Sequence, residues 1–442
     1  MDVDSFQFTN DIWFIGVQCG NTPNNIKPYR GNTSSVSVPK TNPAEIKHLI
    51  FGFMLYEPQI GYNYTEWMRD TINYLHDSKF FPKLETIHVF YVGARIDFDE
   101  LPDHYPVYGR YMEYFLLRSD PDVMERYSIG LDPDAKWIDS LNDKKALWLI
   151  GDVSTRPHKF PLLYKFYIEN DLDRLNYSLT TVLQTQEGYD PLTISDSPGN
   201  YWLERIFKEV FDLELSFTEL ADLYHKLKRE MPDDMFGELA LKGIHQFDLA
   251  TYCFPKDWNK ATLIVMPETW FKHPLEPESF QGDGGISRRQ YWENNSYPTT
   301  EKTWKAIATK KPFIGISYND LQEKSLERLG YKTFRKYTHH PKMIDADDYL
   351  SVAEHINIAH TRITTFLDNS SSYAPGIEKD IEYNYEHHKH VIKEHWNELY
   401  QCCPVLKHVD KVKFLRLFSI PAPWHQPLDS PQSDWIMSKP GW

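Results

Sequence analysis

Short apolar runs, separated by stretches with helical spacing, constrain the fold of this chain more than any other feature. The clearest runs lie at 48–53, 86–92, 145–151, 262–271 and 311–317. A short run that is apolar throughout is typical of a strand buried on both faces, as in a parallel sheet covered by helices. The alternation of such strands with helices therefore predicts an α/β protein with doubly wound parallel sheets.

The helices and the remaining strands follow from periodicity. Strand-like runs are also present at 11–17 and 331–334. Apolar residues with helical spacing predict helices at 65–76, 108–118, 160–170, 201–213, 217–230, 319–329, 345–366 and 377–400.

The stretch 298–307 has the features of a helix start directly before a strand. Pro298 and the threonines at 299 and 300 offer an N-cap, and Glu301 stands in the first turn, where the helix dipole favours an acid. Lys302 and Lys305 are three residues apart and share one helix face. Such a start offers unpaired N–H groups and positive charge to a phosphate. The alternative is an ordinary capped helix with solvated lysines.

A second basic loop follows the strand predicted at 145–151. It contains Arg156, His158 and Lys159, and the helix predicted at 160–170 comes directly after them. A strand, a basic loop and a helix in this order predict a second anion-binding loop. The alternative is a solvent-exposed basic helix start.

A long polar and aromatic segment at 271–298 precedes the helix start. Loops of this length are usually functional or mobile. Arg289, Tyr291 and Trp292 offer a guanidinium and rings that can stack on a sugar or a base. The same side chains could instead fill an interface between domains.

Size and charge limit the partners. A chain of 442 residues exceeds one usual domain and predicts two. The formal net charge of -15 argues against general attraction to nucleic acid or anionic lipid, although a local basic groove is compatible with it. The four cysteines have no metal-type or framework spacing, which favours a reducing cytoplasm. The acidic N-terminus and the lack of long apolar runs predict neither a signal peptide nor a membrane span.

Two groups of residues raise the question of a metal site. Asp-X-Asp triplets begin at Asp97, Asp120 and Asp132, and such triplets can hold a divalent metal against a diphosphate. Two of them are Asp-Pro-Asp, which is typical of turns. His387, His388 and His390 stand close together, but neighbouring side chains of a helix point in different directions. We therefore expect no metal.

One composite motif and three further segments, in the same order along the chain, together resemble a family of glycosyltransferases seen in bacteria and tailed phages. The family pattern runs roughly TEKTWKPI, PFI and LGFKTF, and this chain has Thr-Glu-Lys-Thr-Trp-Lys at 300–305, Pro-Phe-Ile at 312–314 and Leu-Gly-Tyr-Lys-Thr-Phe at 329–334. The other similar segments are 155–159 (family RPHR), 267–271 (family ETYF), and Asn384 with His387 (family N..H). The resemblance covers about 145–400. The family pattern is in turn distantly similar to the Thr-Glu-Lys segment of α-1,3-fucosyltransferases.

The resemblance implies a GT-B-like fold, in which two Rossmann-like domains face each other across a cleft. We expect residues 1–255 to form an N-terminal Rossmann-like, acceptor-side domain that contains a helical insertion. Residues 256–400 would form the C-terminal domain, which binds the nucleotide sugar. A Pro- and Trp-rich tail at 401–442 would pack back on the body. The implied activity is transfer of a sugar from a nucleotide-sugar donor to a hydroxyl-bearing acceptor. The nucleotide sugar is a substrate, and neither a cofactor nor a divalent metal is required.

The same resemblance, joined to the charge pattern, gives donor-binding candidates. The leaving nucleotide gains negative charge as the glycosidic bond breaks, so it needs hydrogen-bond donors and cations. The candidates on the C-terminal side are Thr300, Glu301, Lys302 and Lys305. Arg156 or Lys159, from the facing domain, would complete the clamp when the domains close.

The acceptor side is assigned from chemistry alone. An acceptor hydroxyl needs a general base, and His158 and Glu268 are the candidates because each is expected at a strand end. Acceptor binding is expected of Arg289, Tyr291 and Trp292. The acceptor would be a glycan, a small molecule or modified DNA, met in the cytoplasm, or in a host cytoplasm if the protein is phage-encoded.

Two alternatives remain open at this point. A phage-type DNA glycosyltransferase would act on hydroxymethylated bases flipped out of the stack, which the net charge of -15 disfavours unless a basic groove is local. A non-catalytic module would keep the site for a nucleotide or glycan without turnover. The absence of a G-x-G-x-x-G segment after a strand argues against a dinucleotide-dependent dehydrogenase.

Overall fold

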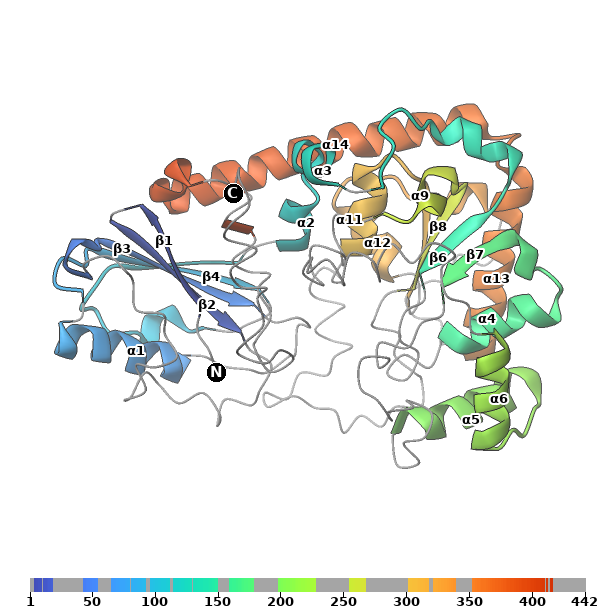
Figure 1. The fold of residues 1–442 in the computed structure, drawn as a ribbon, viewed down its shortest axis with the longest axis horizontal. Coiled ribbons are helices and arrows are strands. Elements are labelled where there is room, and N and C mark those ends of the chain that lie inside the picture. The colour runs from blue at the N-terminus through green and yellow to red at the C-terminus, as the bar shows by residue number, and fades with distance from the viewer. Residues whose placement is uncertain are drawn as a thin grey trace.

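The computed structural model describes residues 4–9, 11–18, 43–54, 65–79, 81–92, 96–111, 114–128, 130–149, 159–178, 198–227, 254–267, 301–317, 321–338, 352–409, 411 and 414–415. They form two β-sheets with helices packed against them, and one long helix that runs past both sheets (Figure 1). The prediction of an α/β protein built on parallel strands is confirmed for these residues.

The first sheet has the strand order β1-β2-β3-β4-β5. β1 is antiparallel to β2, and all other neighbouring strands are parallel. The strands are β1 (Asp4–Thr9), β2 (Ile12–Gln18), β3 (His48–Met54), β4 (Thr86–Val92) and β5 (Val107–Tyr111). The prediction of a helix at 108–118 is wrong in its first part, because β5 pairs with β4 and the helix α2 begins only at Tyr114.

Helix α1 (Thr65–Ser78) covers one face of the first sheet. Leu49 and Phe51 of β3 point to this face with Ile87 and Val89 of β4, because side chains alternate along a strand. Together with apolar residues of α1 such as Met68, they form a buried cluster of their own. The first sheet therefore has a core that is separate from the main one.

The second sheet has the strand order β7-β6-β8-β9, and all of its strands are parallel. Its strands are β6 (Ala146–Leu149), β7 (Leu175–Ser178), β8 (Leu263–Pro267) and β9 (Phe313–Ile316). We expected a domain boundary at 255/256, but β6 pairs directly with β8. The second sheet thus takes strands from both sides of that boundary, and the correction is that β6 and β7 belong with the C-terminal strands.

Two helical crossovers cover the opposite faces of the second sheet. Helix α4 (Lys159–Ile168) connects β6 to β7 and packs against α13 (Val352–Asn369), which also contacts β8 and β9. Helix α11 (Glu301–Ala308) connects β8 to β9 and packs against α14 (Ala374–Cys402). Parallel crossovers are right-handed, so connections that run in opposite directions along a sheet place their helices on opposite faces.

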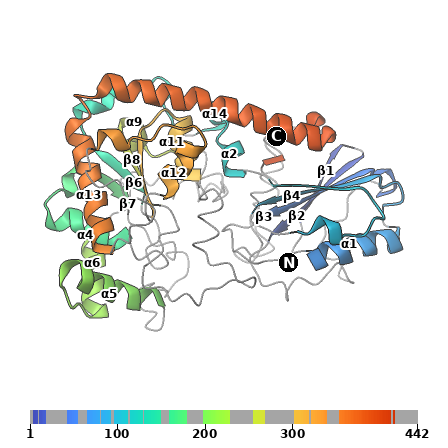
Figure 2. The ribbon, with the colours of Figure 1, turned by 180° about the vertical axis from the view of Figure 1, so that it is seen from behind.

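Helix α14 links the two sheets. It passes beside α11 and continues past α2 (Tyr114–Arg118) to the first sheet, as the two opposite views show (Figures 1 and 2). Near its end, Glu398 forms an ion pair with Arg110 of β5. Phe414, from the segment after α14, packs edge-on against Phe90 of β4, with ring centroids 5.5 Å apart. Residues 416–442 of the expected tail lie outside the described residues.

The remaining elements are short or peripheral. Helices α5 and α6 confirm the predictions at 201–213 and 217–230, and they pack beside α4 and α13. The other α-helices are α3 (Pro121–Tyr127), α5 (Pro198–Phe211), α6 (Phe217–Leu227), α9 (Lys256–Lys260) and α12 (Leu321–Arg328). The 3-10 turns are Pro43–Glu45, Phe98–Glu100, Trp137–Asn142, Leu172–Arg174, Arg335–Tyr337 and Pro404–His408.

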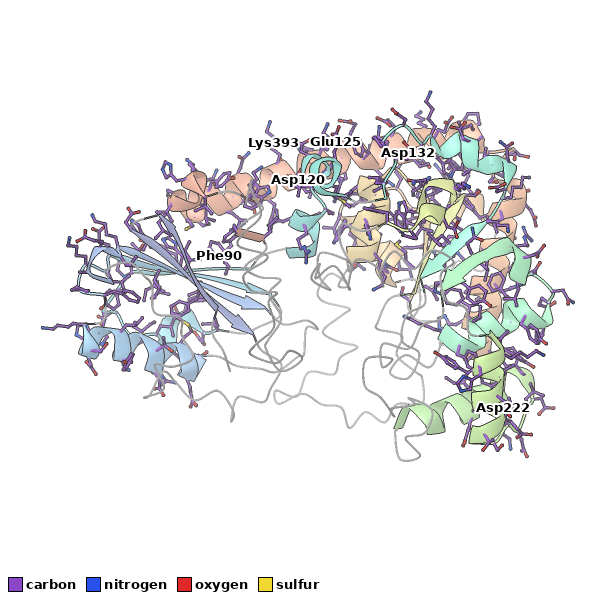
Figure 3. All side chains as sticks on the ribbon, in the orientation of Figure 1. Phe90, Asp120, Glu125, Asp132, Asp222 and Lys393 are labelled. Atoms are coloured by element: carbon purple, nitrogen blue, oxygen red, sulfur yellow. The ribbon has the colours of Figure 1, made fainter. Side chains whose placement is uncertain are left out.

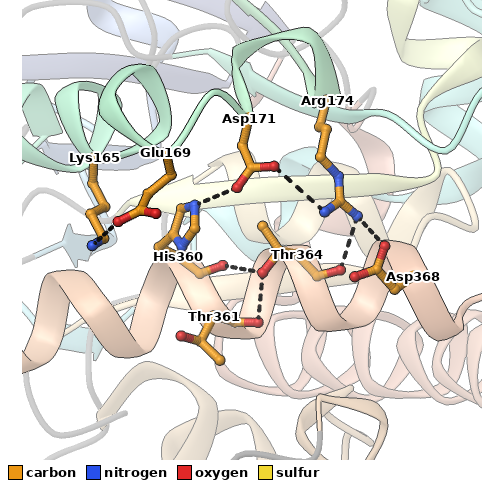
Figure 4. A network of polar contacts seen from close by, with 8 residues as sticks. All are labelled: Lys165, Glu169, Asp171, Arg174, His360, Thr361, Thr364 and Asp368. Atoms are coloured by element: carbon orange, nitrogen blue, oxygen red, sulfur yellow. Dashed lines mark hydrogen bonds and ion pairs between the residues drawn. The ribbon is translucent and has the colours of Figure 1, made fainter.

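A polar network ties α13 to the turn between α4 and β7 (Figure 4). His360 Nε2 lies 3.0 Å from Asp171 Oδ2, and Arg174 donates to Asp368 Oδ1 at 2.6 Å and to the carbonyl oxygen of Thr364 at 3.1 Å. The network lies where α4 has ended and β7 has not begun, which is the amino edge of the second sheet. It therefore holds α13 against the sheet at the edge opposite to the carboxyl ends of the strands.

The strand predicted at 331–334 does not form, and α14 provides the reason. Asn384 accepts from Lys332 N at 2.8 Å and donates to Lys332 O at 2.7 Å, so one side-chain amide satisfies the backbone groups that a neighbouring strand would take. His387 Nε2 lies 2.8 Å from the carbonyl oxygen of Leu329. At Gly330, φ is +89°, and a Cβ would lie 2.8 Å from His387 Nε2, so only glycine fits this turn.

Within the described part of the chain, none of the helices combines the length and the apolar character that a membrane crossing needs.

Candidate functional site

The second sheet contains a topological switch point between β6 and β8. From β6 the chain crosses to β7 on one side, and from β8 it crosses to β9 on the other side. In open α/β sheets, ligands bind outside the carboxyl ends of the strands at such a point, because the connecting loops diverge there. The carboxyl ends of β6 and β8, at Leu149 and Pro267, therefore mark the candidate site.

Two helices begin at this edge of the sheet. In a parallel crossover the helix runs back antiparallel to the strands, so its first turn lies at their carboxyl ends. Lys159 is the first residue of α4 and is buried, while Lys302 is the second residue of α11 and is half-buried. Each first turn also has N–H groups that lack intrahelical partners. The edge thus combines two helix starts and two lysines.

This arrangement corrects one expectation about the clamp. Lys159 was expected to come from the domain facing Lys302, and to approach it on closure. Because β6 and β8 are neighbours, α4 and α11 instead begin at the same edge of one sheet. Lys159 and Lys302 need no closure of domains to share that edge.

Lys305 lies apart from the helix start. Its side chain is buried, and its ammonium stands 4.2 Å from the ring centre of Phe254 and 5.4 Å from that of Trp258. Both rings belong to the segment that leads into β8, so the ammonium makes cation–π contacts beside the beginning of that strand. A role of Lys305 in donor binding stays a prediction.

Most of the other predicted site residues lie outside the described residues. Glu301 is the first residue of α11, but its side chain is among those left undescribed. Of these, position 158 directly precedes α4 in the chain and position 268 directly follows β8. The undescribed candidates are Arg156, His158, Glu268, Arg289, Tyr291, Trp292 and Thr300.

The Asp-X-Asp triplets act as local caps. In each triplet the first carboxylate accepts from the backbone N–H of the third residue, at 3.2 Å from Asp97, 3.1 Å from Asp120 and 3.0 Å from Asp132. This is the turn that aspartate favours by its short acceptor side chain. Among the described residues, no group of three or more His, Cys, Asp or Glu side chains could hold a metal ion.

His388 is buried in the main core and joins α14 to two other elements. Its Nδ1 accepts from the Tyr331 hydroxyl at 2.9 Å, and its Nε2 lies 2.9 Å from Ser119 Oγ. The ring stacks on Trp304 of α11. Burial lowers the pKa of His388 to about 3, so the imidazole is neutral. His390 is exposed on another side of the same helix, as the spacing predicts.

A group of buried polar side chains beside β9 was not predicted from the sequence. Arg362 of α13 donates to both carboxylate oxygens of Glu323 in α12, at 2.8 and 2.6 Å, and both side chains are buried. Glu323 Oε1 also accepts from Gly315 N of β9 at 3.3 Å. β9 is an edge strand of the described sheet, so alternate N–H groups point away from β8 and need partners. The only sequence signal was an acid in a short polar helix.

Comparison of the chain with models of known protein families, with curated proteins and with solved structures found no match. The resemblance to glycosyltransferases, built on short motifs, therefore stays a prediction.

Proposed function

We propose that the carboxyl edge of the second sheet binds the diphosphate of a nucleotide sugar, and that the protein transfers the sugar to a hydroxyl group. The observation that carries the proposal is the switch point between β6 and β8, at which α4 and α11 both begin. Helix starts attract anions through their unpaired N–H groups and their dipole. Lys302 and Lys159 add positive charge at the same edge.

The chemistry of group transfer explains why such an edge is needed. As the bond between sugar and diphosphate breaks, negative charge accumulates on the leaving nucleotide. Fixed N–H groups and an ammonium stabilise that charge more in the transition state than in the ground state, which accelerates the reaction. In this proposal Lys302 is the main cation, and no metal is required. Lys305 is left out of the clamp because its ammonium already lies over Phe254.

The acceptor and the base complete the proposal. His158 and Glu268 are next in the chain to α4 and β8, and either would take the proton from an acceptor hydroxyl near that edge. Arg289, Tyr291 and Trp292 would hold the acceptor. In a GT-B-like arrangement the first sheet would form the acceptor-side domain, facing the second sheet.

The test is binding and turnover with a panel of UDP-, GDP- and dTDP-sugars. We expect one nucleotide to bind to the wild-type protein, and the matching sugar to be released to water or to an added acceptor. Lys302→Ala should raise the Kd for that nucleoside diphosphate about tenfold, which corresponds to about 1.4 kcal/mol of lost charge-assisted hydrogen bonding. The control is Lys393→Ala, at an exposed lysine on the outer side of α14 (Figure 3), which should leave the Kd unchanged.

Other outcomes would select the alternatives. Nucleotide binding that depends on Lys302, with no turnover of any donor, would support the non-catalytic module. Binding of hydroxymethylated DNA whose affinity falls steeply with salt concentration would support the alternative of a DNA glycosyltransferase. Binding that is the same in the wild type and in Lys302→Ala would overturn the proposed site.

A further inference from the structure

One buried hydrogen bond joins the first turns of α11 and α12. The side-chain amide of Gln322, the second residue of α12, donates to Thr303 Oγ1, in the first turn of α11, at 2.6 Å. Both side chains are fully buried. Thr303 directly follows Lys302, so this bond acts on the turn that carries the lysine.

The strand β9 provides a rigid base for Gln322. Ser317, the residue after β9, accepts from Gln322 N at 3.0 Å through its hydroxyl and so caps α12. At Gly315 an added Cβ would lie 2.1 Å from Gln322 Oε1 and 2.9 Å from its Cδ. The glycine therefore leaves the space through which the Gln322 side chain passes over the strand.

The next residue anchors α12 from the other side. Glu323 accepts from Gly315 N and from Arg362 of α13, which packs on the opposite face of the sheet from α11. Arg335 Nε stands 3.8 Å from the same carboxylate. The first turn of α12 is thereby held to β9, to α13 and to α11 at once. A movement of α11 along the sheet would have to break the hydrogen bond from Gln322 of α12 to Thr303.

We propose that Gln322 is a positioning residue that fixes the first turn of α11, and with it Lys302, at the carboxyl edge of the second sheet. The inference rests on the proposed nucleotide-binding function of that edge. Gln322 touches no ligand in this proposal and acts through Thr303. A helix start that is held in place loses less conformational freedom when it binds an anion. Removal of the hydrogen bond should therefore reduce the affinity for the nucleotide more than it reduces the stability of the fold.

The experiment compares two substitutions at one position. Thr303→Val keeps the shape of the side chain but has no acceptor for the amide, whereas Thr303→Ser keeps the hydroxyl. The measurements are the Kd for UDP, GDP and dTDP by calorimetry and the midpoint of urea unfolding. We expect Thr303→Val to raise the Kd of the nucleotide that binds about threefold or more, and Thr303→Ser to stay within about twofold of the wild type.

A second pair of variants keeps the test decisive if Thr303→Val does not fold. Gln322→Met retains the length of the side chain without the amide, and Gly315→Ala presses on Gln322 without a change at Thr303. Either should raise the Kd as Thr303→Val does.

The outcomes distinguish a failure of the positioning role of Gln322 from a failure of the proposed nucleotide-binding function. If Lys302→Ala weakens nucleotide binding but Thr303→Val and Gln322→Met leave the Kd within twofold, the positioning role is wrong and the proposed function stands. Equal loss of affinity in Thr303→Ser and Thr303→Val would also overturn the role, since the hydroxyl would then be irrelevant. If the wild type binds none of the three nucleotides, both proposals fall.

Discussion

The two sheets differ in the direction in which the chain visits their strands. In the first sheet the spatial order β1-β2-β3-β4-β5 is the order in the sequence, so the connections advance in one direction. In the second sheet the order β7-β6-β8-β9 reverses direction between β6 and β8. Among the described strands, only the second sheet therefore has a switch point. This difference, rather than charge or composition, places the candidate site on the second sheet.

The sheets also differ in what they bury. The first sheet has a small apolar cluster under α1, and on its other face His88 lies 3.1 Å from the Thr86 hydroxyl. Beside the second sheet, Glu323 and Arg362 form an ion pair inside the protein. Paired burial holds separate helices in fixed positions, because a buried charge that loses its partner is costly. The pair thus holds α12 and α13 at fixed positions beside β9.

The largest expected effect on stability comes from breaking the ion pair between Glu323 and Arg362. Arg362→Met removes the cation and leaves the Glu323 carboxylate inside the protein with Gly315 N and the more distant Arg335. We expect the free energy of unfolding to fall by about 3–5 kcal/mol, the usual cost of breaking a buried ion pair. Urea unfolding followed by tryptophan fluorescence measures it.

The matched control lies between α14 and the first sheet. Glu398→Gln breaks the ion pair with Arg110, in which both side chains are about a third to a half exposed. Such a pair contributes at most about 1 kcal/mol. A loss in Arg362→Met no larger than in Glu398→Gln would contradict the contrast between the two sheets.

A smaller effect is expected at the contact between α14 and residues 329–332. Asn384→Ala removes both hydrogen bonds to the Lys332 backbone, at a cost of about 2 kcal/mol for two bonds of ordinary strength. Asn142→Ala is the control, because its amide is exposed and its bond to Asp139 O is long, at 3.4 Å. Both are measured by urea unfolding. Equal stability of the two variants would show that water replaces the Asn384 amide without loss.

The last expected effect concerns the first sheet and depends on pH; it is the smallest of the set at pH 6, where it stays below about 1 kcal/mol. Burial, with a smaller contribution from His48, lowers the pKa of His88 to about 4, below its ordinary value of 6.5. Above pH 6.5 neither the folded nor the unfolded chain holds the proton. Between pH 6.5 and about 4 the unfolded chain holds the proton and the folded chain does not. The free energy of unfolding therefore decreases as the pH is lowered, by up to about 1.4 kcal/mol per pH unit. Below about pH 4 the loss levels off.

His88→Gln removes this titration and keeps a group that can bond to Thr86. Urea unfolding at pH 8, 6 and 5 should show a shallower loss of stability in the variant than in the wild type. His390→Gln, at an exposed position of α14, is the control and should follow the wild type. Parallel curves for all three proteins would contradict a neutral, buried His88.

Local pattern was enough to predict most of the elements but not their assembly. The apolar runs at 86–92 and 311–317 predict β4 and β9, because burial on both faces leaves a continuous apolar signature. The boundary at 255/256 failed because β6 and β8 pair across more than a hundred intervening residues, and no local signal records which strand a run will meet. The strand at 331–334 failed because Asn384, far along the chain, takes its backbone groups.

The candidate site divides in the same way. The sequence by itself determined that Lys302 stands in the first turn of a helix and that Lys159 lies next to the start of another, since spacing and capping act over a few residues. Only the tertiary structure decided that these helices begin at one edge of one sheet, that Lys305 turns to Phe254, and that Gln322 holds Thr303. The physical reason is that periodicity and capping are properties of neighbours in the chain. Strand order and buried polar pairs depend on which distant segments bury each other.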